Sequence, residues 1–200
     1  MKNKKILRKK VWDDLTNNNL IIPPKSAYGR IPIFKGSTEA AELIITTNEY
    51  LESNIIFSSP DSAQIKVREY ALKDKKTLIM ATPKLKNGYI LIKPENVTGV
   101  EEYASTIEGA FKAGELIDSF PKVDMVVEGS VAVDLHGNRL GKGGGYGDME
   151  ISHLFQENVI SDKTPIVTTV HKIQILDEIP AEEHDKQINM IVTPKNIIRI

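Results

Sequence analysis

The chain has 200 residues, 40% of them hydrophobic, and a formal net charge of -1, with 26 Lys and Arg against 27 Asp and Glu. Without a basic excess no nucleic-acid partner is expected, because no surplus of positive charge supplies nonspecific attraction to a polyanion. The absence of cysteine excludes disulfides and thiolate chemistry, and no apolar run approaches the ~18 residues of a membrane helix, so we expect one cytoplasmic domain over residues 1–200 with no membrane partner.

The first predicted element is an amphipathic helix from Lys2 to Leu15 with a basic flank. Its apolar residues recur at a spacing close to one helix face, and Lys4 and Arg8, four positions apart, share a face. Two interpretations are open: these cations reach an anionic ligand, or they form a solvated basic face while Trp12 packs in the core. An irregular region rich in turn formers follows as far as Gly36.

The next segments predict parallel strands. Ser37 or Thr38 is expected to cap a helix over Glu39–Thr46. A strand, a helix and a strand then follow at Asn54–Phe57, Gln64–Lys73 and Thr77–Ala81. This order is a βαβ unit, which places its two strands parallel in one sheet.

The rest of the chain supplies more strands. They are expected at Tyr89–Ile92, Val123–Val127, Val131–Val133, Pro165–Val170 with an extended continuation through His171–Ile175, and Ile188–Val192. Pro94–Gly114 is polar and is expected to mix loop with short helix. The pattern predicts an α/β fold with a central, mostly parallel sheet, whose ligands bind beyond the carboxyl ends of the strands. Glu128, near that edge, is a candidate to face the ligand cleft.

The stretch Gly137–Asp148, called here the glycine loop, carries the strongest functional pattern. Its glycines allow positive φ and close approach of N–H groups to a ligand, and Arg139 and Lys142 attract anions. The loop matches neither the P-loop pattern nor G-x-G-x-x-G, so a flexible turn is the alternative. Its place between the strand Val131–Val133 and a helix predicted over Asp148–Leu154 favours a phosphate site, because a helix start attracts anions.

Three motifs carry a resemblance to a known family: Lys4-x-x-x-Arg8, the glycine loop, and His184-Asp185. With them the chain resembles the 5-formyltetrahydrofolate cyclo-ligases, also called methenyltetrahydrofolate synthetases, and Lys10–Leu15 and Gly29–Gly36 are similar to the archaeal and cyclo-ligase-like branch. The resemblance implies a three-layer α/β sandwich, shared with sugar-phosphate isomerases and CoA transferases. It also implies ATP-dependent ring closure: the formyl oxygen of 5-formyltetrahydrofolate is phosphorylated, N10 attacks the activated carbon, and phosphate leaves to give 5,10-methenyltetrahydrofolate.

The resemblance also implies roles for the matching positions. Lys4 and Arg8 would bind nucleotide phosphates, and the loop would wrap ATP with Arg139, Leu140, Gly141, Lys142, Gly143, Gly144, Gly145, Tyr146 and Gly147. Arg139 and Lys142 would act in catalysis by stabilising charge during phosphoryl transfer. Asp148 and Asp185 would hold Mg²⁺, which takes one or two carboxylates. Tyr146 would also contact the substrate.

Two positions depart from the family pattern. The family's loop usually ends Gly-Tyr-Tyr-Asp, whereas Gly147 replaces the second Tyr here and removes an aromatic contact near the folate. The usual Glu-x-x-Thr substrate contact is replaced by Pro60-Asp61-Ser62-Ala63, so Asp61 takes the place of the Glu with a shorter reach. The expected partners are ATP and a reduced formylfolate or a related formylated pterin. The alternative is a non-catalytic nucleotide- or RNA-binding module that keeps the phosphate loop, while an acyl-CoA or sugar-phosphate enzyme would need a nucleophilic Glu motif that is not recognised here.

Overall fold

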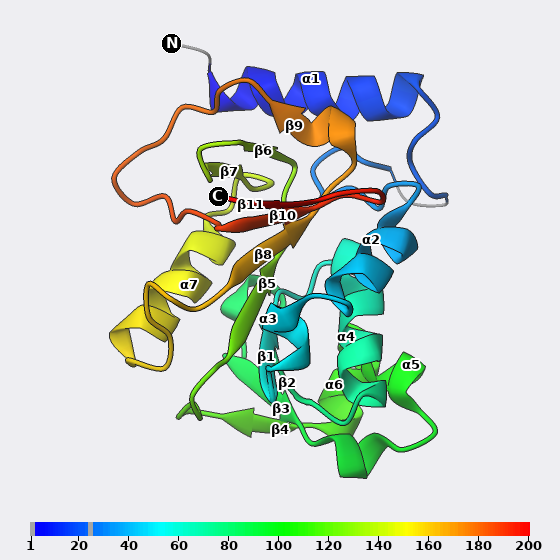
Figure 1. Cartoon of the computed structure of the whole chain (residues 1–200), viewed down its shortest axis with the longest axis vertical. Coiled ribbons are helices and arrows are strands. Elements are labelled where there is room, and N and C mark those ends of the chain that lie inside the picture. Colours follow the sequence, from blue (N-terminus) through cyan, green and yellow to red (C-terminus); the bar gives the residue numbers. More distant parts are fainter. Residues whose placement is uncertain (1–2, 24–25) are drawn as a thin grey trace.

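A sheet of eight strands runs through the centre of the computed structural model, which describes residues 3–23 and 26–200 (Figure 1). In spatial order the strands are β11 (Ile197–Arg199), β10 (Met190–Val192), β8 (Ile166–Thr169), β5 (Met125–Glu128), β1 (Ile55–Ser58), β2 (Thr77–Ala81), β3 (Tyr89–Ile92) and β4 (Glu115–Ile117). The strands from β10 to β2 are parallel, and β11, β3 and β4 join antiparallel at the two edges. The predicted α/β fold with a mostly parallel central sheet is confirmed.

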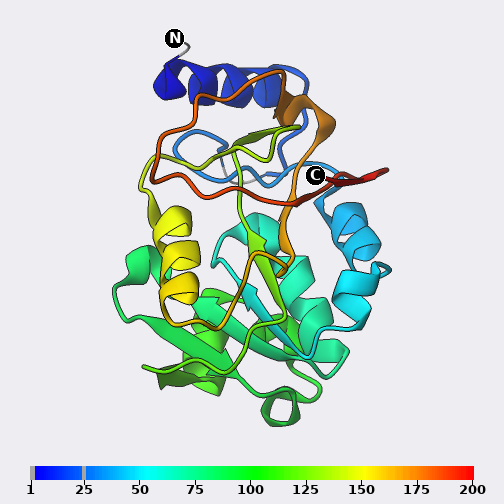
Figure 2. The same cartoon turned by 60° about the vertical axis from the view of Figure 1, so that its left-hand side comes forward.

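Helices cover both faces of this sheet and make three layers. They are α2 (Ser37–Ile44), α3 (Asn48–Leu51), α4 (Ile65–Lys73), α5 (Glu101–Ala104), α6 (Ile107–Ala113) and α7 (Tyr146–Gln156). Helix α7 lies on one face, and α2 and α4 lie on the other (Figures 1 and 2). Short 3-10 helices connect the elements: η1 (Ser62–Gln64), η2 (Pro83–Leu85), η3 (Pro94–Val97) and η4 (Lys172–Gln174).

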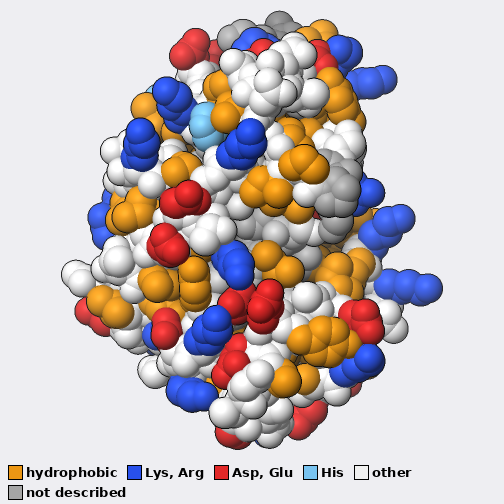
Figure 3. Space-filling model, turned by 90° about the vertical axis from the view of Figure 1, so that its right-hand side faces the viewer, with side chains coloured by type: hydrophobic (Ala, Val, Ile, Leu, Met, Phe, Trp, Pro, Cys, Tyr) orange, Lys and Arg blue, Asp and Glu red, His pale blue; other side chains and the backbone are white. Residues whose placement is uncertain are grey.

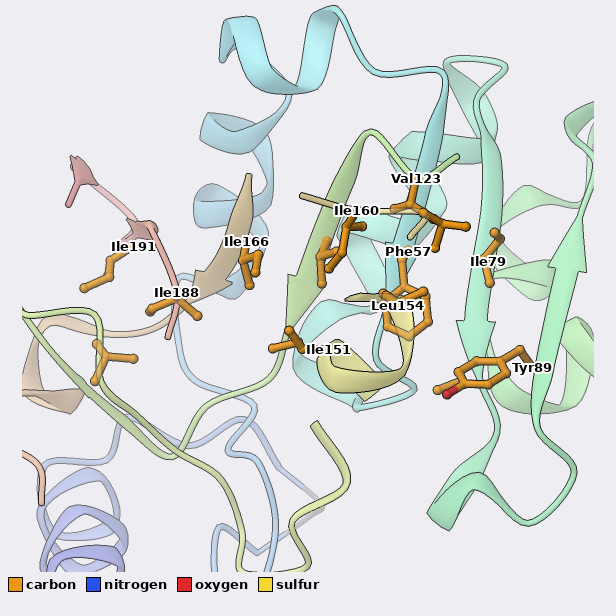
Figure 4. Packing of buried hydrophobic residues seen from close by; sticks show 14 of the residues in the cluster. Phe57, Ile79, Tyr89, Val123, Ile151, Leu154, Ile160, Ile166, Ile188 and Ile191 are labelled. Carbon is orange, nitrogen blue, oxygen red and sulfur yellow. The ribbon is translucent and has the colours of Figure 1, made fainter. Parts of the chain in front are cut away.

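The side chains of the parallel strands alternate between the two faces. Phe57 of β1 packs with Ile151 and Leu154 of α7 (Figure 4). On the opposite face, Ile56 of β1 and Met125 of β5 pack in the cluster that includes α2 and α4. Both faces are therefore buried, and strands in that position read as continuous apolar runs.

Helix α1 (Lys4–Asn17) packs against a second, smaller sheet. That sheet has the order β7-β6-β9 and consists of β7 (Arg139–Leu140), β6 (Ala132–Asp134) and β9 (Ile175–Leu176). Leu7, Val11 and Leu15 of α1 are buried with Val131 and Leu140. Figures 1 and 2 show α1 next to the small sheet, at the end of the molecule toward which the chain leads after β5 and β8. The basic face of α1 is thereby placed beyond the carboxyl ends of the parallel strands.

Helices α2 and α7 each begin two residues before the predicted start. The N-cap of α2 is Gly36, with φ of 98° and no side-chain cap, so the predicted cap at Ser37 or Thr38 is wrong. A Cβ on Gly36 would lie 2.4 Å from Pro194 Cγ, which only glycine avoids. Helix α7 begins at Tyr146, earlier than predicted, and α1 begins at Lys4, so the predicted start at Lys2 lies outside the described residues.

The strand predictions also needed correction in places. The extended continuation over His171–Ile175 is wrong at Lys172–Gln174, because the side chains of His171 and Gln174 accept backbone N–H groups and close the turn of η4. Ile175 is extended, as the first residue of β9. Strand β6 pairs in the small sheet, and β4, β7 and β11 were not predicted.

Among the described residues no helix combines the length and apolar character needed to cross a bilayer. On the face drawn in Figure 3, cationic and anionic side chains are interspersed. The assignment of residues 1–200 to one domain stays a prediction.

Candidate active site

The glycine loop leaves the small sheet at β7 and enters α7. At its start the buried carboxylate of Asp134 accepts hydrogen bonds from three backbone N–H groups of the surrounding turns, at 2.9 to 3.0 Å. At its end Gly143 and Gly145 have φ of 110° and 71°, which glycine adopts readily. Gly145 is the N-cap of α7 and no side chain caps it. The first N–H groups of a helix lack intrahelical partners, so this turn is suited to an anion.

Lys4 and Arg8 of α1 reach the glycine loop and the turn before β10. The Nε of Arg8 donates to the carbonyl oxygen of Gly141 at 2.6 Å, and burial lowers the pKa of Arg8. The Nζ of Lys4 donates to Asp185 at 2.6 Å and to Glu182 at 2.9 Å. Burial opposes the charge on Lys4, but these two hydrogen bonds outweigh it and raise the pKa of Lys4. The structure brings these three segments together, and their role in phosphate binding stays a prediction.

The two cations of the loop differ in freedom. Arg139 is buried, and its guanidinium donates to Asp148 Oδ1 at 2.8 Å and to the carbonyl oxygen of Gly129 at 3.2 Å. Lys142 is 40% exposed, and its Nζ pairs with Asp61 Oδ1 at 2.7 Å. Arg139 is therefore held in place, whereas Lys142 can move to a ligand. The side chain of Leu140 is buried in the α1 core cluster, so only its backbone is suited to the predicted contact with ATP.

Two cavities share the glycine loop as a wall. The α1-side cavity, of about 300 Å³, is lined by Lys4, Arg8 and Asp185 together with loop glycines. The β5-side cavity, of about 310 Å³, is lined by Asp61, Glu128 and Tyr146. Arg139, Gly141, Gly144, Gly145 and Asp148 line both cavities. Each volume lies at the lower end of the range typical of small-molecule sites, and two ligands can meet at the shared wall.

Two buried carboxyl groups lie in the β5-side cavity. Glu128 ends β5, Glu150 lies on α7, and both side chains are almost fully buried. Burial raises the pKa of Glu128 to about 7, although the charge of Arg139 opposes the shift. Burial, together with the adjacent Glu128, also raises the pKa of Glu150. The two carboxyl groups lie side by side, and their contact opposes the upward pKa shift of Glu128 and adds to the upward pKa shift of Glu150.

Glu128, the candidate from the sequence to face the ligand cleft, lines this cavity. Glu150 was missed, although a signal for it exists. Gly147, Glu150, Ile151 and Leu154 follow the i, i+3, i+4, i+7 spacing of a buried helix stripe. A glutamate on such a stripe needs a partner in the interior.

Gly147 lies against the same groups. A Cβ at this position would lie 2.8 Å from Arg139 Nη2 and 2.9 Å from Glu128 Oε2. The loss of the family's second tyrosine therefore coincides with a carboxylate and a guanidinium, one of which would have to shift to admit a Cβ. This corner of the cavity is polar, where an aromatic contact had been expected from the family pattern.

Asp61 and Tyr146, the two predicted substrate contacts, both line the β5-side cavity. The turn that carries Asp61 is held by Arg68, which is fully buried and donates to the carbonyl oxygens of Ser59 at 2.7 Å and Asp61 at 3.0 Å. The carboxylate of Asp61 is itself paired with Lys142. A substrate would have to compete with that ion pair for Asp61.

The two predicted metal ligands, Asp148 and Asp185, line the α1-side cavity together. Each already pairs with a cation, Asp148 with Arg139 and Asp185 with Lys4. Among the described residues, the closely spaced group of possible ligand atoms is Asp185 with Glu182 and His184, and Asp148 is not part of it. Carboxylate oxygens are the ligands that Mg²⁺ prefers, so the two aspartates offer the kind of ligand that fits this ion. Their assignment as its ligands stays a prediction.

Comparison with known proteins places these features in a family. A sequence profile of the 5-formyltetrahydrofolate cyclo-ligase family matches residues 1–194. Methenyltetrahydrofolate synthase domain-containing proteins of Bos taurus and Homo sapiens are each 35% identical over 210 residues, covering 98% of this chain and 53% of theirs. The chain thus spans about half the length of these relatives. A solved structure of Aquifex aeolicus 5,10-methenyltetrahydrofolate synthetase is similar with a TM-score of 0.61 and 25% identity, over 98% of this chain and 92% of that one.

Proposed function

The chain belongs to the 5-formyltetrahydrofolate cyclo-ligase family, and from this membership and the site we propose that it is an ATP-dependent cyclo-ligase. It converts 5-formyltetrahydrofolate, or a related formylated pterin, to 5,10-methenyltetrahydrofolate with release of ADP and phosphate. The observation that carries the proposal is the placement of Lys4, Arg8 and Asp185 against the glycine loop, although they come from opposite ends of the chain.

The α1-side cavity would take the phosphates of ATP. Arg8 offers a planar fork of donors suited to phosphate oxygens, and the uncapped start of α7 offers backbone N–H groups and the positive end of a helix. Arg139, held by Asp148 and a backbone carbonyl, is preorganised, and that lowers the cost of stabilising charge as a phosphoryl group moves. Lys142 can leave Asp61 to follow that charge.

A magnesium ion would be held by Asp148 and Asp185 in the same cavity. When bound, it would neutralise negative charge on the phosphate oxygens. Lys4 and Arg139 pair with these carboxylates. In the loaded site Arg139 would stay on Asp148 and share it with the ion, while Lys4 would turn from Asp185 toward the phosphates. The exchange keeps every charged group paired.

The formylated pterin would occupy the β5-side cavity, with Tyr146 in its wall. Its formyl oxygen must reach the terminal phosphate of ATP at the wall that both cavities share, where Gly141, Gly144 and Gly145 have no side chains to block the approach. The catalytic contribution is positioning, which brings the two reactants into contact.

One assay tests the proposal. Protein, Mg-ATP and 5-formyltetrahydrofolate are mixed, and methenyl absorbance and ADP are followed together. Formation of both in equal amounts supports cyclo-ligase activity. ATP binding without turnover on any formylated pterin would contradict it and favour a non-catalytic nucleotide-binding module, an alternative that is consistent with relatives about twice as long as this chain.

Lys142→Ala is expected to weaken the binding of Mg-ATP by ~1 to 3 kcal/mol, through loss of a charge-assisted contact. Isothermal titration with a non-hydrolysable ATP analogue measures the change. Lys163→Ala, which removes an exposed lysine that lines neither cavity, is the control for a general loss of positive charge. Unchanged affinity in Lys142→Ala would remove Lys142 from the phosphate site.

A further inference from the structure

The buried polar atoms without a hydrogen-bond partner gather around one cavity. Among the described residues these atoms are Ser59 Oγ, Gln64 Oε1, Glu128 Oε1, Arg139 Nε and Glu150 Oε2. All of these residues except Gln64 line the β5-side cavity, and Gln64 Oε1 is 3.1 Å from the position of a Cβ on Gly129, which also lines it. Buried polar groups in folded proteins are nearly always paired. A set of unpaired groups around one cavity points to a polar ligand that supplies their partners.

Glu128 is the best placed of these groups to select a ligand. Its backbone is fixed at the end of β5, where Thr168 Oγ1 donates to the Glu128 carbonyl oxygen at 2.7 Å. Its side chain is 1% exposed, and Oε1 has no partner although Arg139 and Glu150 lie beside it. Glu150 contributes a second acceptor oxygen, Oε2, which is also buried and without a hydrogen-bond partner. The floor of the cavity thus presents two unpaired acceptors on rigid elements.

We propose that Glu128, supported by Glu150, recognises the N–H edge of the pterin ring, and that it takes the substrate-binding role assigned by sequence to Asp61. The ring of a 2-amino-4-oxopterin carries an amino group beside a ring N–H, two adjacent donors that carboxyl oxygens can accept together. The inference rests on the proposed function for the identity of the ligand.

Two observations favour Glu128 over Asp61. The carboxylate of Asp61 is paired with Lys142, whereas Glu128 Oε1 has no partner in the described chain. Gly147 leaves the carboxyl group of Glu128 uncovered, because a Cβ at that position would lie 2.9 Å from Glu128 Oε2 and one of the two groups would have to shift. The glycine that departs from the family's loop and the glutamate that lies beneath it therefore form one arrangement for binding a donor-rich ring edge.

The test measures binding rather than turnover. Isothermal titration compares 5-formyltetrahydrofolate with its 2-desamino-2-methyl analogue, which lacks the amino donor, on the unmodified protein and on Glu128→Gln. The unmodified protein is expected to bind the parent compound roughly tenfold or more tightly than the analogue, the size of a charge-assisted hydrogen bond. Glu128→Gln should lose that preference and keep its affinity for ADP, which shows that the fold is intact.

Two controls accompany the variant. Glu157→Gln changes a less buried glutamate at the end of α7 and should leave the preference unchanged. Asp61→Asn tests the rival residue. The proposal would be overturned if Asp61→Asn lost the preference for the parent compound over the analogue while Glu128→Gln kept it. If Glu128→Gln fails to fold, the comparison of the two compounds on the unmodified protein decides, because equal affinities contradict recognition of the amino edge.

The outcomes separate this inference from the proposed function. Preferential binding that depends on Glu128, without formation of methenyl product in the presence of Mg-ATP, would support recognition and contradict cyclo-ligase activity. Turnover with no dependence of binding on Glu128 would support the activity and contradict recognition. Failure to bind any formylated folate would contradict both.

Discussion

Gly147 and Glu128 lie together in one corner of the β5-side cavity, and the position of Glu128 helps to explain why residue 147 is a glycine. A glycine within a helix costs stability relative to alanine, by about 0.5 to 1 kcal/mol in the helix interior. Here that cost is offset because a Cβ would meet Arg139 and Glu128 at less than 3 Å. Arg139 is itself tied to Asp148, so the neighbours cannot move away freely.

Gly147→Ala is expected to raise the KM for 5-formyltetrahydrofolate roughly tenfold, since displacement of positioned groups by about 1 Å weakens an interaction by that order or more. The KM for ATP should change less, because the α1-side cavity is not lined by Gly147. Steady-state kinetics with each substrate varied in turn measures both constants. Met149→Ala, an exposed position in the same turn, is the control. Equal changes in the two KM values would show that Gly147 does not act on the pterin side.

The roles of individual residues were only partly accessible from sequence. The glycine loop was recognisable because its residue order is specific, and Lys4 and Arg8 were found as a helix-face pair. Glu150 was missed because its importance depends on a contact with Glu128, and no sequence spacing links these two residues. The ion pair between Asp61 and Lys142 was equally invisible, since it joins residues 81 positions apart in the chain.

At the scale of elements, prediction succeeded where burial of an apolar run alone determined the structure. The ranges of β2 and β3 were predicted correctly because buried apolar runs with turn formers at both ends have few alternatives. Strand β7 was missed because its two residues, Arg139 and Leu140, carry no pattern of their own and are paired by tertiary contact with β6. The turn of η4 was missed because side-chain hydrogen bonds of His171 and Gln174 compete with the strand.

Helix α4 offers a test of stability that does not involve the ligands. Burial opposes the charge on Glu69, but hydrogen bonds from Lys66 and Lys73 outweigh it and lower the pKa of Glu69. A lowered pKa means that the ionised pair stabilises the fold above the unfolded pKa of about 4.3, and that this stability is lost as the pH falls through the lower folded value.

Glu69→Gln is therefore expected to lower the free energy of unfolding by about 1 kcal/mol at pH 7, a small value because both lysines are partly exposed. The difference from the unmodified protein should shrink toward zero as the pH falls below the lowered pKa of folded Glu69, where the carboxyl group is protonated in both states. Urea unfolding at a series of pH values measures it. Glu52→Gln, at an exposed position, should show no such trend. A difference that stays constant with pH would assign the loss to packing instead of charge.

At the scale of the whole molecule, the candidate site is assembled from segments that are distant in the chain. Helix α1 packs on the small sheet through apolar residues on one face, and on another face Lys4 bonds to Asp185 and Arg8 bonds to the loop. The turn with Glu182 and Asp185 closes the same cavity from the C-terminal part of the chain. No local pattern predicts this meeting, because it depends on the small sheet that carries β7 and supports α1.

Hydrogen exchange measured by mass spectrometry tests this assembly directly. Binding of a non-hydrolysable ATP analogue with Mg²⁺ is expected to slow exchange in three separate segments: 3–9 at the start of α1, the loop at 139–148, and the turn at 182–186. Ligand binding stabilises whatever it contacts and slows local opening there, and α1 is coupled to the turn through Lys4 and to the loop through Arg8. Helix α4 packs on the face of the central sheet opposite to α7. It serves as the internal control and should exchange at an unchanged rate. Protection confined to residues 139–148 would mean that the nucleotide is held by the loop alone, and that α1 and the turn with Asp185 take no part in binding it.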